Sequence, residues 1–233
     1  MSKFRLLKKI IILGLILALP GFLYYLLTAK GKNRYKPLPI YGPKQVAKTG
    51  HKVHGQFIPD TIFHKLADFN LTDQYGKPVS LASFDKKIVV YNFFYTNGGE
   101  QSNKINSAAD SLAAIYSRNK MVYFVSVSVD PERDKGTALK SYADENTPVY
   151  AQRLFLTGDT TTIYKFARKG LLVDALQLGK NNFIYSNQLI LVDSDKRIRG
   201  YYSSVMTDDI TRITDEIKVL ITEELRKNDK PLY

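Results

Sequence analysis

The residues best placed for chemistry form a short polar loop, Asn97 to Ser102, which follows an apolar run from Ile88 to Tyr95. The apolar run predicts a buried central strand, and helical spacing begins near Ser102. In an open α/β sheet, ligands bind at such strand-to-helix loops. Backbone N–H groups there could bind a small anion or a protein partner. The alternative is an ordinary helix start, capped by Ser102 or Ser107.

The chain has three histidines, His51, His54 and His64. Three imidazoles could bind Zn²⁺ or Cu²⁺, and the His51-x-x-His54 spacing would suit one face of a helix. Two glycines and Pro59 in the same stretch disfavour a helix there. A histidine metal site is therefore an alternative hypothesis, and we expect His64 to be a packing or hydrogen-bonding residue at the edge of the domain.

A dense charge cluster, Asp130, Glu132, Arg133 and Asp134, ends a second apolar run from Met121 to Val129. The cluster could serve as an acid–base group. Such clusters more often cap the next helix and pair internally, and this is our prediction.

Tyrosine is abundant, with 16 residues that include the adjacent pair Tyr201 and Tyr202. An exposed aromatic patch would be a protein-docking surface. We expect most of these tyrosines to be core or half-buried strand residues instead.

Composition excludes several classes of function. The chain has no cysteine, so it has no disulfide, no thiolate nucleophile and no thiolate metal site. Its net charge is +12, but residues 1–50 hold ten Lys or Arg and no acidic residue, leaving 24 basic and 22 acidic residues in the rest. The remainder therefore carries only 24 − 22 = +2, which argues against nucleic-acid binding. The basic N-terminal segment suits anionic lipid headgroups.

An uncharged stretch from Ile10 to Ala29 follows the basic residues 1–9. Its length is enough to span a bilayer core of ~30 Å. A cleaved signal peptide is disfavoured, because Leu27 stands where a small residue should precede the cleavage site. We expect an uncleaved transmembrane anchor at residues 10–29, a Lys-, Gly- and Pro-rich tether at 30–59, and a folded domain at 60–233.

Strands alternate with helices in the folded domain. A hairpin at Asp68 to Leu81 precedes the central strand, and a second hairpin at Gln188 to Ser203 precedes a final amphipathic helix. The order hairpin, βαβαβα, ββα predicts an α/β fold, with a mixed sheet covered by helices on both faces.

At this point the sequence resembles the Sco/SenC family, membrane-anchored thioredoxin-fold copper chaperones for cytochrome oxidase assembly. The resemblance implies a thioredoxin-like fold, a protein partner in oxidase assembly, and a domain on the periplasmic side of the inner membrane. The matching stretches are Phe69 to Val79, Phe94-Tyr95-Thr96, Val127 to Asp134 with its Asp-Pro-Glu-Arg-Asp, Leu156-Thr157-Gly158, and Gln188 to Asp193.

The family's copper ligands, a Cys-x-x-x-Cys pair and a distant His, are missing from this chain. The resemblance places them at Gly98, Ser102 and Tyr185. Glycine offers no side chain, and serine and neutral tyrosine are poor ligands for Cu⁺. We expect no cofactor and no metal at these positions.

The sequence therefore predicts a non-catalytic accessory or interaction module. The alternatives are a metal-binding protein that uses His51, His54 and His64, or a copper chaperone with relocated ligands. An enzyme, such as a cysteine-free relative of the peroxiredoxins, is disfavoured, because no nucleophile lies beside a recognisable base.

Overall fold

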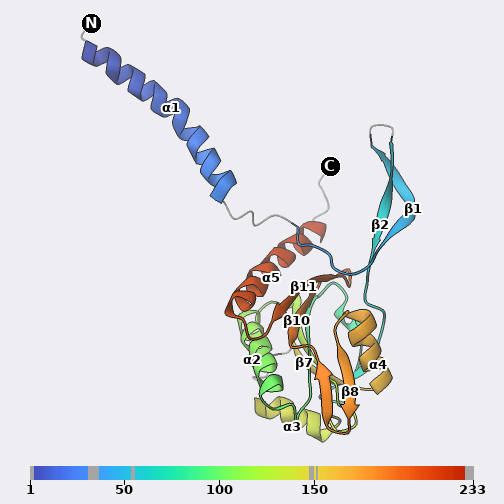
Figure 1. The fold of residues 1–233 in the computed structure, drawn as a ribbon. Helices are drawn as coiled ribbons and strands as arrows, with labels where there is room; N and C mark the ends of the chain where they lie inside the picture. Colours follow the sequence, from blue (N-terminus) through green and yellow to red (C-terminus); the bar gives the residue numbers. More distant parts are fainter. Residues whose placement is uncertain (1–2, 31–36, 54–55, 147–149, 151, 229–233) are drawn as a thin grey trace. The chain divides into compact units, whose positions relative to one another are not determined.

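The computed structural model describes residues 3–30, 37–53, 56–146, 150 and 152–228 (Figure 1). The chain divides into two compact units, residues 1–36 and 37–233. In the first unit, the described residues form helix α1 (Lys3–Lys30), with Pro20 inside it. Judged on its described residues, no helix of this chain is both long and apolar enough to cross a membrane. The anchor at residues 10–29 stays a prediction.

The second unit is built on a seven-stranded mixed sheet with the order β11-β10-β5-β6-β7-β3-β4. The pairs β5–β6 and β6–β7 are parallel, and the other pairs are antiparallel. The predicted α/β fold with a mixed sheet is confirmed. The strands are β3 (Asn70–Asp73), β4 (Pro78–Ser80), β5 (Ile88–Phe94), β6 (Val122–Ser128), β7 (Arg153–Thr157), β10 (Gln188–Val192) and β11 (Ile198–Ser203).

Helices cover both faces of this sheet. Helices α2 (Gly99–Ile115), α3 (Thr137–Asn146) and α5 (Thr207–Asn228) share one core cluster with Ile88 and Val90 of β5. On the other face, the 3₁₀ turn η1 (Leu81–Phe84), helix α4 (Thr160–Lys165) and the π-helical turn η2 (Phe166–Gly170) pack with Val89 and Tyr91. Both clusters take their buried side chains from residues 66–220, so the second unit has its own core.

Two short strands, β8 (Ala175–Gly179) and β9 (Asn182–Tyr185), form a separate hairpin that sequence reasoning did not predict. Ala175, Phe183 and Tyr185 are buried, whereas Leu176 and Ile184 face solvent as a cross-strand pair. The alternation brings Tyr185 into the core.

Within the stretch predicted as a tether, residues 30–59, the structure describes residue 30 and residues 37–53 and 56–59, and most of these lie in two strands. Strands β1 (Lys44–Val53) and β2 (Gln56–Phe63) pair antiparallel as a long hairpin that projects from the second unit (Figure 1). At the base of the hairpin, His64 N donates to Pro43 O (3.1 Å), and Tyr41 N donates to Ile198 O (2.9 Å). The folded unit therefore begins at Pro37 rather than at residue 60.

Candidate functional site

The loop singled out from the sequence follows β5 and leads into α2. Gly98 N donates to Tyr95 O (2.9 Å), which closes the turn before the helix begins. Asp134, which follows the neighbouring strand β6, binds the loop. Its carboxylate accepts hydrogen bonds from Thr96 N (2.8 Å), Thr96 Oγ1 (2.5 Å) and Ser128 Oγ (2.6 Å). The loop is therefore fixed at the carboxyl ends of two parallel strands.

Ser102 and Tyr185 meet at the first turn of α2, although 83 residues separate them in the sequence. Ser102 Oγ lies 2.9 Å from Tyr185 Oη, and both residues are buried. Ser102 Oγ also accepts a hydrogen bond from Tyr95 N (3.2 Å). Both hydroxyls are thus engaged within the protein.

Gly98 completes this cluster by having no side chain. A Cβ atom at this position would lie 1.9 Å from Ser102 Oγ and 2.8 Å from Ser102 Cβ. The Ser102 hydroxyl therefore occupies the space that a side chain at position 98 would need. The structure brings Gly98, Ser102 and Tyr185 together.

The Tyr185 ring belongs to a small aromatic cluster. Tyr95 packs edge-on against Tyr185, with ring centroids 5.8 Å apart, and Phe183 packs against Tyr95, with ring centroids 5.0 Å apart. Burial raises the pKa of Tyr185, and the Ser102 hydrogen bond opposes this only in part. The phenol is neutral at physiological pH.

These three positions do not suit copper. A neutral phenol and a serine hydroxyl are hard, weak donors, whereas Cu⁺ prefers thiolate, thioether or imidazole ligands. Gly98 contributes no side-chain donor, and the Ser102–Tyr185 hydrogen bond satisfies the two hydroxyls without a metal. No chemical step through copper follows from this arrangement.

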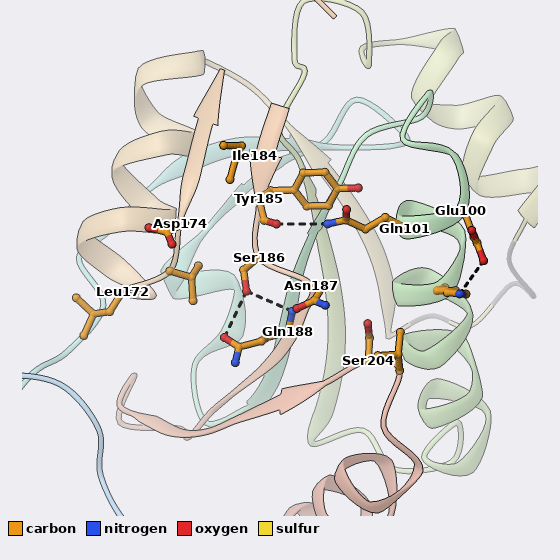
Figure 2. A pocket seen from close by; sticks show the side chains of 13 residues that line it. Glu100, Gln101, Leu172, Asp174, Ile184, Tyr185, Ser186, Asn187, Gln188 and Ser204 are labelled. Carbon is orange, nitrogen blue, oxygen red and sulfur yellow. Dashed lines mark hydrogen bonds and ion pairs between the residues drawn. The ribbon is translucent and has the colours of Figure 1, made fainter. Parts of the chain in front are cut away.

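A groove of about 670 Å³ opens beside Tyr185, between α2, β9 and residues 172–174 (Figure 2). Gln101 crosses it and donates from Nε2 to Tyr185 O (3.3 Å). Glu100 pairs with Lys104 at 2.7 Å along the helix. Exposed Leu172 and Ile184 supply apolar surface to the lining. The groove combines backbone and side-chain hydrogen-bonding groups with apolar contacts, as a peptide-binding surface would.

The structure does not bring the histidines together. His51 Nδ1 lies 3.3 Å from Asp60 Oδ1 on the exposed hairpin, and His64 Nε2 donates to Gly170 O (2.7 Å) at the base. His51 pairs across the hairpin with Ile58, and His64 lies six positions further along the chain than Ile58, which is about 20 Å of strand. His54 lies outside the described residues. Within the described chain, no group of three or more His, Asp or Glu could hold a metal ion.

The charge cluster after β6 pairs internally, as predicted. Asp130 forms an ion pair with Arg133, which also donates from its guanidinium to Asn181 Oδ1 (3.0 Å) in the turn between β8 and β9. Asp134 binds the Thr96 backbone and hydroxyl, on the loop before α2, and the predicted cap of the next helix stays a prediction. The cluster thus positions the loop and the hairpin around the site.

Tyr201 and Tyr202 do not form a docking patch. Tyr202 is fully buried and donates to Glu216 Oε2 (2.5 Å), while half-buried Tyr201 donates to Leu171 O (3.0 Å). The expectation that they are core or half-buried residues is confirmed.

The contacts of Gln101 and Thr96, and the β8–β9 hairpin, are the site features that the sequence did not predict. Alternating apolar residues on either side of Gly179-Lys180-Asn181 could have indicated the hairpin. No pattern in the sequence signalled the contacts of Gln101 or Thr96, because their partners lie 84 and 38 residues away.

Comparisons with known proteins agree with this fold. The SCO1/SenC family model matches residues 61–222. A SCO1 protein homolog of Bacillus subtilis (strain 168) is 28% identical over 167 residues, which cover 70% of this chain and 86% of the relative.

Solved structures give the same result. A SCO1/SenC family lipoprotein from Bacillus anthracis str. Ames matches with a TM-score of 0.63 and 26% identity, over 68% of this chain and 95% of that one. BsSco, a member of the Sco family of cytochrome c oxidase assembly proteins, matches with a TM-score of 0.61 and 26% identity, over 68% and 94%. The family match extends over most of the chain, and it covers the loop, helix α2 and Tyr185. This chain belongs to the SCO1/SenC family.

Proposed function

We propose that this protein is an accessory member of the SCO1/SenC family that has lost copper binding and thiol chemistry and acts through a protein partner in respiratory oxidase assembly. The observation that carries the proposal is the buried hydrogen bond between Ser102 and Tyr185, with no side chain at Gly98. These groups satisfy one another, so the loop has neither a soft ligand nor a thiol to exchange. The role is binding rather than catalysis.

The partner surface that we favour is the groove beside Tyr185. It lies next to the loop, and exposed Leu172 and Ile184 give it apolar contacts. A photo-crosslinker at Ile184 should capture a membrane protein of the oxidase assembly pathway. The matched control is Ile115, which is also exposed, at 60%, but lies at the end of α2 away from the groove. Equal capture at both positions would remove the support for this surface.

We also propose that residues 10–29 anchor the chain in the inner membrane and that residues 37–233 lie on the periplasmic side. The uncharged stretch supports the anchor. Protease added to intact spheroplasts should then digest the folded unit. Protection until the membrane is lysed would reverse the orientation.

Copper competition tests the loss of metal binding. Residues 37–233 are titrated with Cu⁺ under anaerobic, reducing conditions against a chromogenic chelator. We expect no competition from the natural sequence and tight binding after Gly98→Cys, Ser102→Cys and Tyr185→His are combined. Ser102→Cys alone is the control, since one thiol does not complete the site.

Tight one-to-one binding by the natural sequence would overturn the proposal. Replacing His51, His54 and His64 with Ala would then decide whether the histidines or other, relocated residues bind the copper. Loss of binding would identify the histidine site, and unchanged binding would indicate other relocated ligands.

A further inference from the structure

The β1–β2 hairpin projects from the rest of the second unit (Figure 1) and carries exposed apolar side chains. Val46 is 77% exposed, Phe57 57%, Ile58 44% and Ile62 53%. A two-stranded hairpin with nothing packed on it is marginally stable in water. We therefore expect another surface to cover these apolar side chains.

Both faces of the hairpin carry apolar residues. The cross-strand pairs Lys52↔Phe57 and Val46↔Thr61 place Phe57 and Val46 on one face, because alternate residues of β2 share a side. The opposite face carries Ile58 and Ile62. A groove on a protein partner would cover only one face of the hairpin. A lipid layer would contact both faces of a hairpin that enters it.

The charge of the hairpin is positive. Between residues 44 and 63 the chain has three lysines, Lys44, Lys48 and Lys52, and one acidic residue, Asp60, which faces His51 at 3.3 Å. Within the described residues, Lys48 and Lys52 have no ion-pair partner. Like charges oppose pairing with a second copy of the hairpin, and anionic headgroups attract it.

The edges of the hairpin are poor templates for strand addition by another protein. Pro59 has no N–H to offer along the β2 edge, and lysines recur along β1. Contact must therefore come through the side chains. At Gly50 the Phe57 ring lies across the strand, since a Cβ there would be 2.6 Å from Phe57 Cζ.

We propose that the β1–β2 hairpin is a second membrane contact, which binds the surface of an anionic bilayer independently of the N-terminal helix. Phe57 and Ile58, on opposite faces, enter the headgroup boundary, and Lys48 and Lys52 lie among the phosphates.

Vesicle flotation of residues 37–233 tests the proposal without the N-terminal helix. The unit has its own core and should bind vesicles of phosphatidylcholine mixed with phosphatidylglycerol better than phosphatidylcholine alone. Phe57→Ser with Ile58→Ser should lower partitioning roughly tenfold or more. Lys48→Gln with Lys52→Gln should lower binding only to the anionic vesicles, and added salt should do the same.

The matched control is Leu176→Ser with Leu178→Ser, which removes two exposed leucines from β8 and should leave partitioning unchanged. Unaltered thermal melting of each variant shows that the fold is intact. The proposal is wrong if the natural unit does not float with anionic vesicles, or if the control variant loses as much binding as the hairpin variant. A hairpin-dependent dimer in sedimentation, without vesicle binding, would assign the surface to a second copy.

Discussion

Arg153 and Asp110 form an ion pair whose guanidinium is almost completely buried beneath α2. Arg153 Nε donates to Asp110 Oδ1 (2.7 Å), and the exposed fractions of the two side chains are 1% and 13%. The guanidinium also donates to Ser126 Oγ (2.8 Å) and Asn106 Oδ1 (3.2 Å). Burial lowers the pKa of Arg153, and Asp110 opposes the shift.

Asp110→Ala should therefore destabilise the fold by about 3 kcal/mol, because it leaves a buried charge without its counter-ion. Urea unfolding of residues 37–233 measures the loss. Asp144→Ala is the control: it breaks the exposed Lys140–Asp144 pair and should cost ~0.5 kcal/mol or less. Equal losses would show that the buried pair adds nothing beyond a surface pair.

Alkaline pH should weaken the fold through its buried tyrosines. Burial, with a contribution from Asp215, raises the pKa of Tyr116 to about 12, and burial also raises the pKa of Tyr185. In the unfolded chain a tyrosine has a pKa of about 10. Between these two pKa values the folded state keeps protons that the unfolded state has released. The contribution of these tyrosines to the free energy of unfolding is therefore fully present below pH ~10 and falls towards pH 12.

The free energy of unfolding in urea, measured from pH 8 to pH 11.5, checks this decline. Tyr116→Phe should make the decline shallower. Tyr75→Phe replaces a tyrosine that is 51% exposed and should leave it unchanged. A flat profile for the natural sequence would contradict the prediction.

The central strand could be predicted because its signal is local. Apart from Asn92, Ile88 to Phe94 is a run of β-branched and aromatic residues, and all seven residues are buried. The resemblance likewise placed Gly98, Ser102 and Tyr185 at one site, and the structure brings them into contact. These inferences needed only strand pattern and motif order.

Features that depend on partners distant in sequence could not be predicted. Arg153 opens a strand and would be expected at the surface, but Asp110 on α2 makes its burial possible. The sequence of the β1–β2 hairpin predicts a tether, because its lysines, glycines and Pro59 are typical of linkers. Its pairing depends on register between the strands rather than on local preference.

Tyr91 can be used to test what a buried hydroxyl without a hydrogen-bond partner costs in stability. It is fully buried, and among the described residues its hydroxyl has no hydrogen-bond partner. Tyr91→Phe should leave stability unchanged or raise it by up to ~1 kcal/mol. Tyr164→Phe is the contrast, because Tyr164 donates to Val129 O (2.9 Å) and its loss should cost about 1 kcal/mol. Thermal or urea unfolding of the two variants would disprove this account if Tyr91→Phe proved the more damaging.

Residues 37–43 should be part of the stable fold rather than a linker. Arg199 is buried and donates to Leu38 O (2.7 Å) and Pro39 O (3.1 Å), while its charge is balanced by Asp193 (3.0 Å) and Glu223 (2.9 Å). Without this segment the guanidinium would lose two acceptors inside the protein. A chain that begins at Lys44 should therefore be about 3 kcal/mol less stable than one that begins at Pro37.

Urea unfolding of the two chains compares them directly, and both retain the complete β1–β2 hairpin. Arg199→Met removes the hydrogen bonds to Leu38 O and Pro39 O in the longer chain, so part of the difference between the two chains should disappear in its presence, while the hydrogen bonds of Tyr41 and Pro43 keep the rest. If the shorter chain unfolded at the same urea concentration as the longer one, the segment would be a passive linker. The folded unit would then begin after residue 43, because the contacts of Arg199 would contribute no measurable stability.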